Sequence, residues 1–238
     1  MKNIAILLTT LLFAASGYAN ETEAKIDSLL KTNIDPYAIN VSAYNNVGSI
    51  MSDDGKLRII SWNNRTQDGV FEYYTYFIYK KKHNARSIVK KMVCKNAKKP
   101  DNKGDYNANN WYGCLYYSAF AIKKGYMLLG YQTYRDISRV KVIEPLKING
   151  DEFVLGDNVF QCGDKKWSRA VFEYSSNTTM SIEYDPFGRR FIFDHLSPEN
   201  PNLSGIYQYY GPDFTYDAFT LKKKLWRLTE DIDIKNKE

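Results

Sequence analysis

One stretch of the chain, residues 194–217, combines the residue types that acid–base chemistry requires. It contains His195, one of only two histidines in the sequence, and further along Asp213 and Asp217. A histidine oriented by a carboxylate can serve as a general base, so these three residues are the candidate catalytic set of a hydrolase-like enzyme. Asp194 directly precedes the histidine, but adjacent residues of a strand point to opposite faces, so we do not expect the two to share a pocket. The alternative hypothesis is structural: the carboxylates accept backbone N–H groups and stabilise a loop.

Aromatic residues indicate a second kind of chemistry, because rings that reach the surface stack on sugar faces or on partner side chains. The sequence holds 20 tyrosines, 12 phenylalanines and 4 tryptophans. The candidate binding residues lie in or near predicted loops and are Trp111, Tyr112, Tyr209, Tyr210 and Tyr216. The other interpretation is that these rings fill and border a β core. The leading hypothesis is a non-catalytic binding module for a glycan or an envelope protein, with an enzyme or a structural envelope component as alternatives.

Patterns typical of metal, cofactor and nucleotide sites are missing from the sequence. The acidic residues within 230–236 offer oxygen ligands, but their spacing does not match a calcium loop. His83 lies in a lysine-rich turn and the cysteines lack a paired short spacing, which argues against zinc. Neither a glycine-rich phosphate loop nor a nucleophile elbow is present. We therefore predict no metal site and no cofactor.

The three cysteines predict one disulfide if the chain is exported to an oxidising compartment. We pair Cys94 with Cys114, because each ends a strand-like run and the segment between them, rich in Lys, Asn and Asp, is typical of a long hairpin loop. Closing a loop of about 20 residues would stabilise the fold by roughly 3 kcal/mol. Cys162 would then remain a buried or free thiol.

The N-terminus has the features of a cleavable secretory signal peptide, predicted to span residues 1–19. Lys2 precedes an apolar run over 4–15, and the small residues Gly17 and Ala19 occupy the positions that a signal peptidase recognises. The apolar run is shorter than the roughly 20 residues that a membrane-spanning helix needs, and no later segment is apolar enough to span. We predict cleavage after Ala19 and a product in the periplasm or outside the cell, without a transmembrane segment.

The formal net charge of +6 is mild and is divided among short lysine clusters. Clusters of two or three lysines are typical of solvated turns and of strand edges, where lysine discourages edge-to-edge pairing. Together with the predicted export, this pattern argues against a nucleic-acid partner.

Two kinds of element must position the candidate residues. Residues 21–33 place Ala24, Ile26, Leu29 and Leu30 at near-helical spacing, which predicts a short N-terminal helix. From there, short aromatic or β-branched runs alternate with turn signals, which is typical of antiparallel hairpins.

We therefore predict an all-β meander of antiparallel hairpins after the helix, as a sandwich, a closed barrel or an irregular propeller-like array. The sharpest turn signal is Asn149-Gly150, which favours a two-residue type I′ hairpin with positive φ at both positions. Residues 20–238 are enough to bury one core, so we predict a single β-rich domain.

The sequence contains several longer motifs, which are Ser52–Trp62, Val171–Ser175, Met180–Asp185, Phe193–Pro198 and Tyr210–Asp217, with Trp226 near the end. With these motifs the chain resembles a family of uncharacterised exported proteins from bacteria of the Bacteroidota type. The resemblance covers residues 45–236 and implies a secreted β-rich protein, while it implies no activity. Residues 63–70 depart from the glycine- and threonine-rich turn expected after the tryptophan, so a shared role for that loop is not implied.

Overall fold

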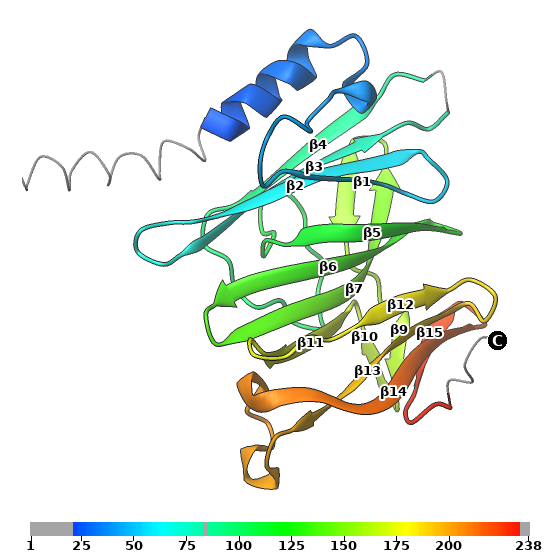
Figure 1. Cartoon of the computed structure of the whole chain (residues 1–238). Coiled ribbons are helices and arrows are strands. Elements are labelled where there is room, and N and C mark those ends of the chain that lie inside the picture. The colour runs from blue at the N-terminus through cyan, green and yellow to red at the C-terminus, as the bar shows by residue number, and fades with distance from the viewer. Residues whose placement is uncertain (1–20, 83–84, 234–238) are drawn as a thin grey trace, which may run out of the picture.

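The computed structural model describes residues 21–82 and 85–233 (Figure 1). The predicted signal peptide and its cleavage site lie outside the described residues. The described chain begins with a helix over residues 21–32 and then forms three β-sheets, so the prediction of an all-β fold with a short N-terminal helix is confirmed.

The order of the strands within the three sheets follows their order along the chain only in part. The four-stranded sheet has the order β1-β2-β3-β4, with β1 (Gly48–Met51), β2 (Leu57–Arg65), β3 (Phe71–Tyr79) and β4 (Ile88–Cys94). The central sheet has the order β11-β7-β6-β5, with β5 (Leu115–Ile122), β6 (Gly125–Arg135), β7 (Ser138–Asn149), β11 (Ala170–Ser175), and β8 (Glu152–Leu155) paired to β7. The six-stranded sheet has the order β10-β9-β15-β14-β13-β12, with β9 (Phe160–Cys162), β10 (Lys165–Trp167), β12 (Ile182–Asp185), β13 (Arg190–Pro198), β14 (Tyr210–Lys222) and β15 (Leu225–Thr229).

The sheets and the helix stack as layers, as Figure 1 shows from top to bottom. One core lies between the four-stranded and central sheets and includes Phe77 and Leu128. A second core lies between the central and six-stranded sheets and includes Leu129 and Phe219. Because the central sheet is covered on both faces, β6 is buried without a break over residues 126–130, in place of the alternating pattern of a half-exposed strand.

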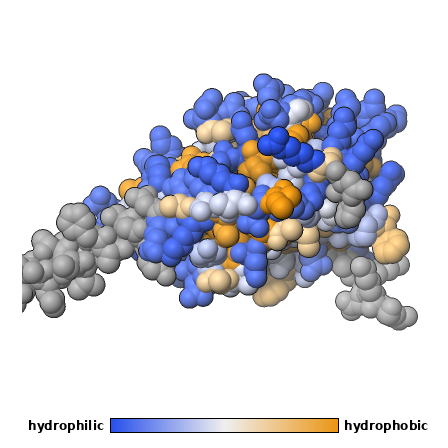
Figure 2. Space-filling view, turned by 90° about the horizontal axis from the view of Figure 1, so that it is seen from above, coloured by the Kyte–Doolittle hydropathy of each residue, from blue (hydrophilic) through white to orange (hydrophobic). Residues whose placement is uncertain are grey.

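The N-terminal helix covers the outer face of the four-stranded sheet. Its Ile26 is fully buried against Trp62 and Tyr76, and Leu29 and Leu30 pack beside it. Ala24, which the helical spacing also assigned to the apolar face, is exposed. Figure 2 looks onto this layer from above and shows a mostly hydrophilic face with hydrophobic residues visible between the polar ones. Within residues 21–82 and 85–233, no helix is long and apolar enough to cross a bilayer.

Two details of the strand pairing differ from the predictions. The hairpin at Gly150 is present, but Asn149 pairs with Glu152, so its central residues are Gly150 and Asp151. Only Gly150 has positive φ, at 59°, which is the pattern of a type II′ turn and not of type I′. In addition, β15 runs parallel to β9, with Trp226 opposite Phe160, so the sheets are not purely antiparallel. No closed barrel forms among the described strands.

The predicted Cys94–Cys114 disulfide is absent, and both thiols are free. The segment between them is not a hairpin loop, because it carries the chain from β4 in the four-stranded sheet to β5 in the central sheet. The Sγ atom of Cys114 lies 3.5 Å from the carbonyl oxygen of Tyr131. It occupies the space over Gly130 that a side chain there would fill. The thiol is therefore packed against β6.

Candidate functional site

The structure brings His195 and Asp217 together on the β13–β14 hairpin. The register of the two strands shifts between Asp194 and Leu196, so that His195 alone faces three residues of β14, Asp213–Thr215, in a β-bulge. Bulges redirect side chains and are frequent next to active sites. The Nδ1 atom of His195 lies 2.9 Å from Oδ2 of Asp217, and the other carboxylate oxygen accepts the backbone N–H of Asp231 at 3.0 Å. The imidazole is about one-third exposed and the carboxylate is nearly buried.

The other two aspartates of this stretch have different partners. Asp213 accepts the hydroxyl of Ser197 at 2.9 Å and the N–H of Thr215 at 3.1 Å. Asp194 accepts the N–H of Ser181 at 2.7 Å. Both carboxylates therefore bond backbone N–H groups, and neither contacts the histidine directly.

The charges around His195 favour its protonated form. Burial lowers the pKa of His195, but the hydrogen bond and negative charge of Asp217, with the charges of Asp213 and Glu230, outweigh burial and raise the pKa above its ordinary value. The Ser197 hydroxyl is bonded to Asp213 and is not presented to the imidazole as a nucleophile. The chemistry that this pair can support is activation of a water by the histidine, oriented by Asp217.

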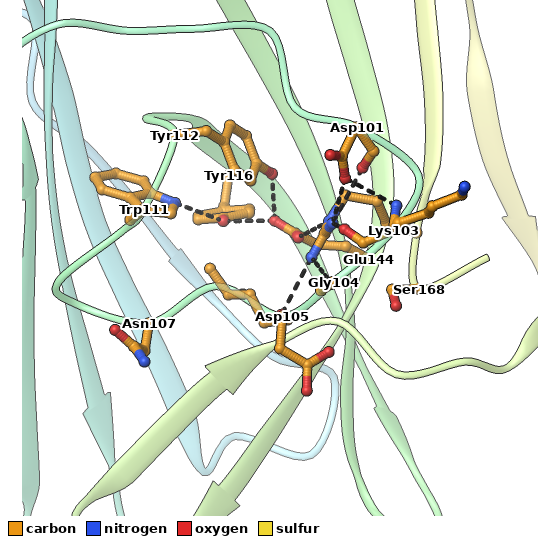
Figure 3. Close-up of polar contacts among 12 residues, drawn as sticks. Asp101, Lys103, Gly104, Asp105, Asn107, Trp111, Tyr112, Tyr116, Glu144 and Ser168 are labelled. Atoms are coloured by element: carbon orange, nitrogen blue, oxygen red, sulfur yellow. Dashed lines mark hydrogen bonds and ion pairs between the residues drawn. The ribbon is translucent and has the colours of Figure 1, made fainter.

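Two of the predicted binding residues, Trp111 and Tyr112, lie in the core and cannot contact a ligand at the surface. They belong to a buried polar cluster around Glu144 (Figure 3). The hydroxyls of Tyr112 and Tyr116 donate to Oε1 of Glu144 at 2.5 and 2.7 Å, and the indole of Trp111 donates to the Tyr116 hydroxyl at 3.3 Å. The sequence prediction failed here because composition does not distinguish an aromatic ring beside a loop from one beneath it.

Arg169 completes this buried cluster. Its Nε lies 3.0 Å from Oε2 of Glu144, and neither side chain is accessible to solvent. The remaining guanidinium nitrogens donate to four backbone carbonyls, those of Asp101, Lys103, Gly104 and Leu155. The cluster has every charge paired and no opening to solvent, so its role is to fasten the 95–114 segment to the central sheet.

The other predicted binding residues lie at the surface of the β13–β14 hairpin. Tyr209 and Tyr216 are exposed, and Tyr210 is half-buried with its ring 5.0 Å from that of Tyr207. Sequence analysis did not single out Phe214, which is 93% exposed and has φ of 71°. Positive φ is unfavourable for a bulky residue, and such outliers concentrate at functional sites. The hairpin thus presents a set of aromatic rings to solvent.

A groove lies beside this hairpin, on the face of the central sheet that carries Arg139 and Lys141. It has a volume of about 580 Å³, and its lining includes Tyr117, Tyr131, Arg139, Lys141, Tyr174 and Thr178. The strand register explains this grouping: Tyr131 lies opposite Lys141, and Arg139 lies opposite Tyr174. Gly211 at the start of β14 faces Thr178, so the aromatic hairpin borders the groove.

The groove is positively charged and aromatic. Its lining contains two cationic side chains and no carboxylate. Tyr117 is the extra residue of a second β-bulge, in β5, and its ring lies 5.3 Å from Nζ of Lys141. The same Nζ donates to the carbonyl of Met180 at 2.5 Å. This arrangement can bind a polar ligand that has a flat face for stacking.

Sequence analysis did not identify this groove, although one signal was present. Arg139 and Lys141 alternate with Val140 and Val142, so the two cations share one face of a strand whose other face is apolar. The signal does not reveal that the two cations line a groove. Within the part of the chain that the structure describes, no cluster of three or more His, Cys, Asp or Glu side chains is arranged to hold a metal ion.

Comparison with known proteins adds no assignment to these sites. No known protein family, curated protein or solved structure matches this chain.

Proposed function

We propose that this protein is an exported, non-catalytic binding module that holds a glycan in the groove of the central sheet. The observation that carries the proposal is the groove itself, in which three tyrosines, Tyr117, Tyr131 and Tyr174, share one cavity of about 580 Å³ with two cations. This volume lies within the usual range of ligand sites, roughly 300 to 1,000 Å³.

The residue types in the groove match the surface of a sugar. A pyranose has an apolar face that stacks on an aromatic ring and hydroxyl groups that need hydrogen-bond partners. Exposed Tyr117 supplies a ring at the rim, while Thr178 and Thr179 supply exposed hydroxyls on the opposite side of the cavity. The aromatic hairpin extends this surface beyond the groove and gives a longer saccharide further rings to contact.

The binding proposal is tested by truncating one ring in the groove and one ring elsewhere. Tyr117→Ala removes the rim ring, and we expect it to weaken glycan binding roughly tenfold on a glycan array followed by titration calorimetry. Phe187→Ala is the matched control, because Phe187 is 93% exposed in the β12–β13 turn and does not line the groove. Equal loss in both variants, or no binding of any glycan by the wild type, would contradict the proposal.

Export is the second part of the proposal and rests on the predicted signal peptide. The product recovered outside the cytoplasm should begin at Asn20 when its N-terminus is sequenced. Retention of Met1 would refute export.

One observation favours a second candidate function, a hydrolase centred on His195. The distance of 2.9 Å between His195 and Asp217 is that of a general base and its orienting carboxylate. If this function holds, His195→Ala abolishes hydrolysis of a glycoside or ester substrate, while Ser197→Ala leaves it intact because that hydroxyl serves Asp213. Absence of turnover by the wild type on both substrate classes would leave the binding module as the function.

A further inference from the structure

We infer that the ligand of the groove is an acidic saccharide whose carboxylate binds to Lys141 and Arg139. The inference rests on the proposed function, because it names the class of glycan that the groove holds. It follows from the charges of the cavity, the pairing of those charges and the shape of the cationic groups.

The two cations of the groove lack protein counter-charges. Among the described residues, neither Arg139 nor Lys141 has a carboxylate within ion-pairing distance, whereas Arg135 and Lys99 both pair with Glu173. Arg139 and Lys141 stand two residues apart on β7 and therefore project from the same face of the strand. The cavity thus holds two cations that have no ion-pair partner among the described residues.

Lys141 is the more constrained of the two cations. Burial lowers the pKa of Lys141, and the charge of Asp194 opposes that effect only in part. The carboxylate of Asp194 is itself bonded to the backbone of Ser181. A partly desolvated ammonium with one carbonyl partner and an aromatic ring gains from an anion that enters the cavity.

Arg139 presents a guanidinium that is already oriented. Its Nη1 donates to the carbonyls of Asp136 and Ser138 at 3.1 and 3.0 Å, which fixes the group at the β6–β7 turn. In the part of the chain that the structure describes, its Nε and Nη2 atoms make no hydrogen bond. A guanidinium with free N–H groups matches the two oxygens of a carboxylate.

The rest of the cavity selects a sugar acid over a small anion. A carboxylate ion fills only a small part of about 580 Å³, and three tyrosines surround the cations. Ser176 and Thr178 add hydroxyl groups on the side of the cavity away from β5. A saccharide of the uronic-acid class provides both parts of the match: a carboxylate for the cations, and a ring with hydroxyls for the tyrosines and threonines.

The experiment compares two probes that differ only in having a carboxylate or a neutral hydroxymethyl group at the same position. A short oligogalacturonide and the same oligosaccharide after carboxyl reduction are each titrated into the full chain by calorimetry. We expect the acidic probe to bind roughly tenfold tighter than the neutral one, with an affinity that falls as salt is raised. Equal affinity for both probes would overturn the inference while leaving the proposed function in place. Failure of both probes to bind would overturn the inference, while the glycan array decides the proposed function.

Variants then locate the charge that acts on the carboxylate. Lys141→Gln and Arg139→Gln should each remove most of the preference for the acidic probe, and Lys141→Arg should restore part of it. Lys166→Gln is the charge-matched control, because Lys166 is exposed on β10 at the opposite edge of the six-stranded sheet from β12. Circular dichroism checks that each variant is folded, so that a failure of one groove variant to fold leaves the other to decide. Equal effects of the groove variants and the control would show that net charge acts alone, and would overturn the inference.

Discussion

His195 is held by carboxylates whose effect on its pKa can be measured through stability. Burial lowers the pKa of His195, but Asp217 outweighs burial. The pKa in the folded protein is therefore raised above the unfolded value of about 6.5. A group with a raised pKa stabilises the fold fully below its unfolded pKa and loses that contribution as pH rises through the folded pKa. The difference in free energy of unfolding between wild type and His195→Gln should therefore be larger at about pH 5.5 than at about pH 8.5 in urea titrations. Ser197→Ala is the control, since it removes no charge, and a similar pH dependence there would refute the assignment.

Glu173 links stability to pH in the opposite direction, because its pKa is lowered in the folded protein. Burial raises the pKa of Glu173, but hydrogen bonds from neighbouring side chains outweigh burial and lower the pKa to about 2. The donors are Lys99, Tyr134, Arg135 and Ser138. A depressed pKa stabilises the fold above the unfolded value, and the contribution disappears as pH falls through the folded pKa.

We therefore expect Glu173→Gln to lower the free energy of unfolding by roughly 3 kcal/mol at neutral pH. The gap between variant and wild type should close from about pH 4.5 down to about pH 2, as measured by urea unfolding at a series of pH values. Glu183→Gln provides the control, because Glu183 is an exposed carboxylate on β12. A gap that stays constant as the pH falls would show that Glu173 acts through packing and not through charge.

At the residue scale, sequence reasoning grouped His195 with Asp217, and the structure places the two in contact. His195 and Asp217 come together because β13 and β14 are adjacent, paired strands. Sequence reasoning failed for Trp111 and Tyr112, whose burial depends on Glu144 and Arg169, which come from strand β7 and from a loop far along the chain. The groove cations were also missed, because the groove is lined by residues of several strands that are separate in the sequence.

The 95–114 segment is held by the buried cluster of Glu144 and Arg169, and we expect a single substitution in this cluster to lower the free energy of unfolding strongly. Arg169→Met leaves the buried carboxylate of Glu144 without its counter-charge, which typically costs about 3 to 5 kcal/mol. We expect a loss of this size in the free energy of unfolding by urea. Asp101→Asn is the matched control, since Asp101 lies 3.9 Å from Arg169 but is 72% exposed, and should change stability by less than about 0.5 kcal/mol.

A double variant distinguishes charge pairing from packing in this cluster. In Glu144→Leu with Arg169→Met neither charge is left unpaired, so the combined loss should be smaller than the sum of the two single losses. Additive losses would mean that the two side chains act independently, contrary to their 3.0 Å contact.

At the element scale, the spacing of apolar residues predicted the helix and local turn chemistry predicted many hairpins, since both depend on residues close in sequence. The pairing of Asn149 with Glu152 shows the limit of this reasoning. Asn-Gly favours a type I′ turn, yet the register of β7 and β8 moves the turn by one residue and leaves positive φ to Gly150 alone. The connections between sheets were not predictable, because the segment after Cys94 has the composition of any polar loop.

The whole molecule has a property that no single sheet has: the central sheet supplies one face to each of two cores. Along β6, Leu128 packs toward the four-stranded sheet and Leu129 toward the six-stranded sheet. A strand buried on both faces loses the period-two pattern from which sheet faces are predicted, so the stack of three sheets was hidden in the sequence. The parallel contact between β15 and β9 was hidden as well, because those strands are far apart in the chain.

This shared sheet makes a prediction about unfolding. Loss of either core exposes one face of the central sheet and removes support for the other, so we expect one cooperative transition in place of two. Phe77→Ala in the first core and Phe219→Ala in the second should each lower stability by about 3 to 5 kcal/mol. Trp111 lies in the first core and Trp226 in the second, so tryptophan fluorescence reports on both. In each variant, the urea midpoints from fluorescence and from far-ultraviolet circular dichroism should coincide and move together. If Phe219→Ala instead shifted one of two separate transitions and left the other at the wild-type midpoint, the six-stranded sheet would unfold on its own and the central sheet would not couple the layers.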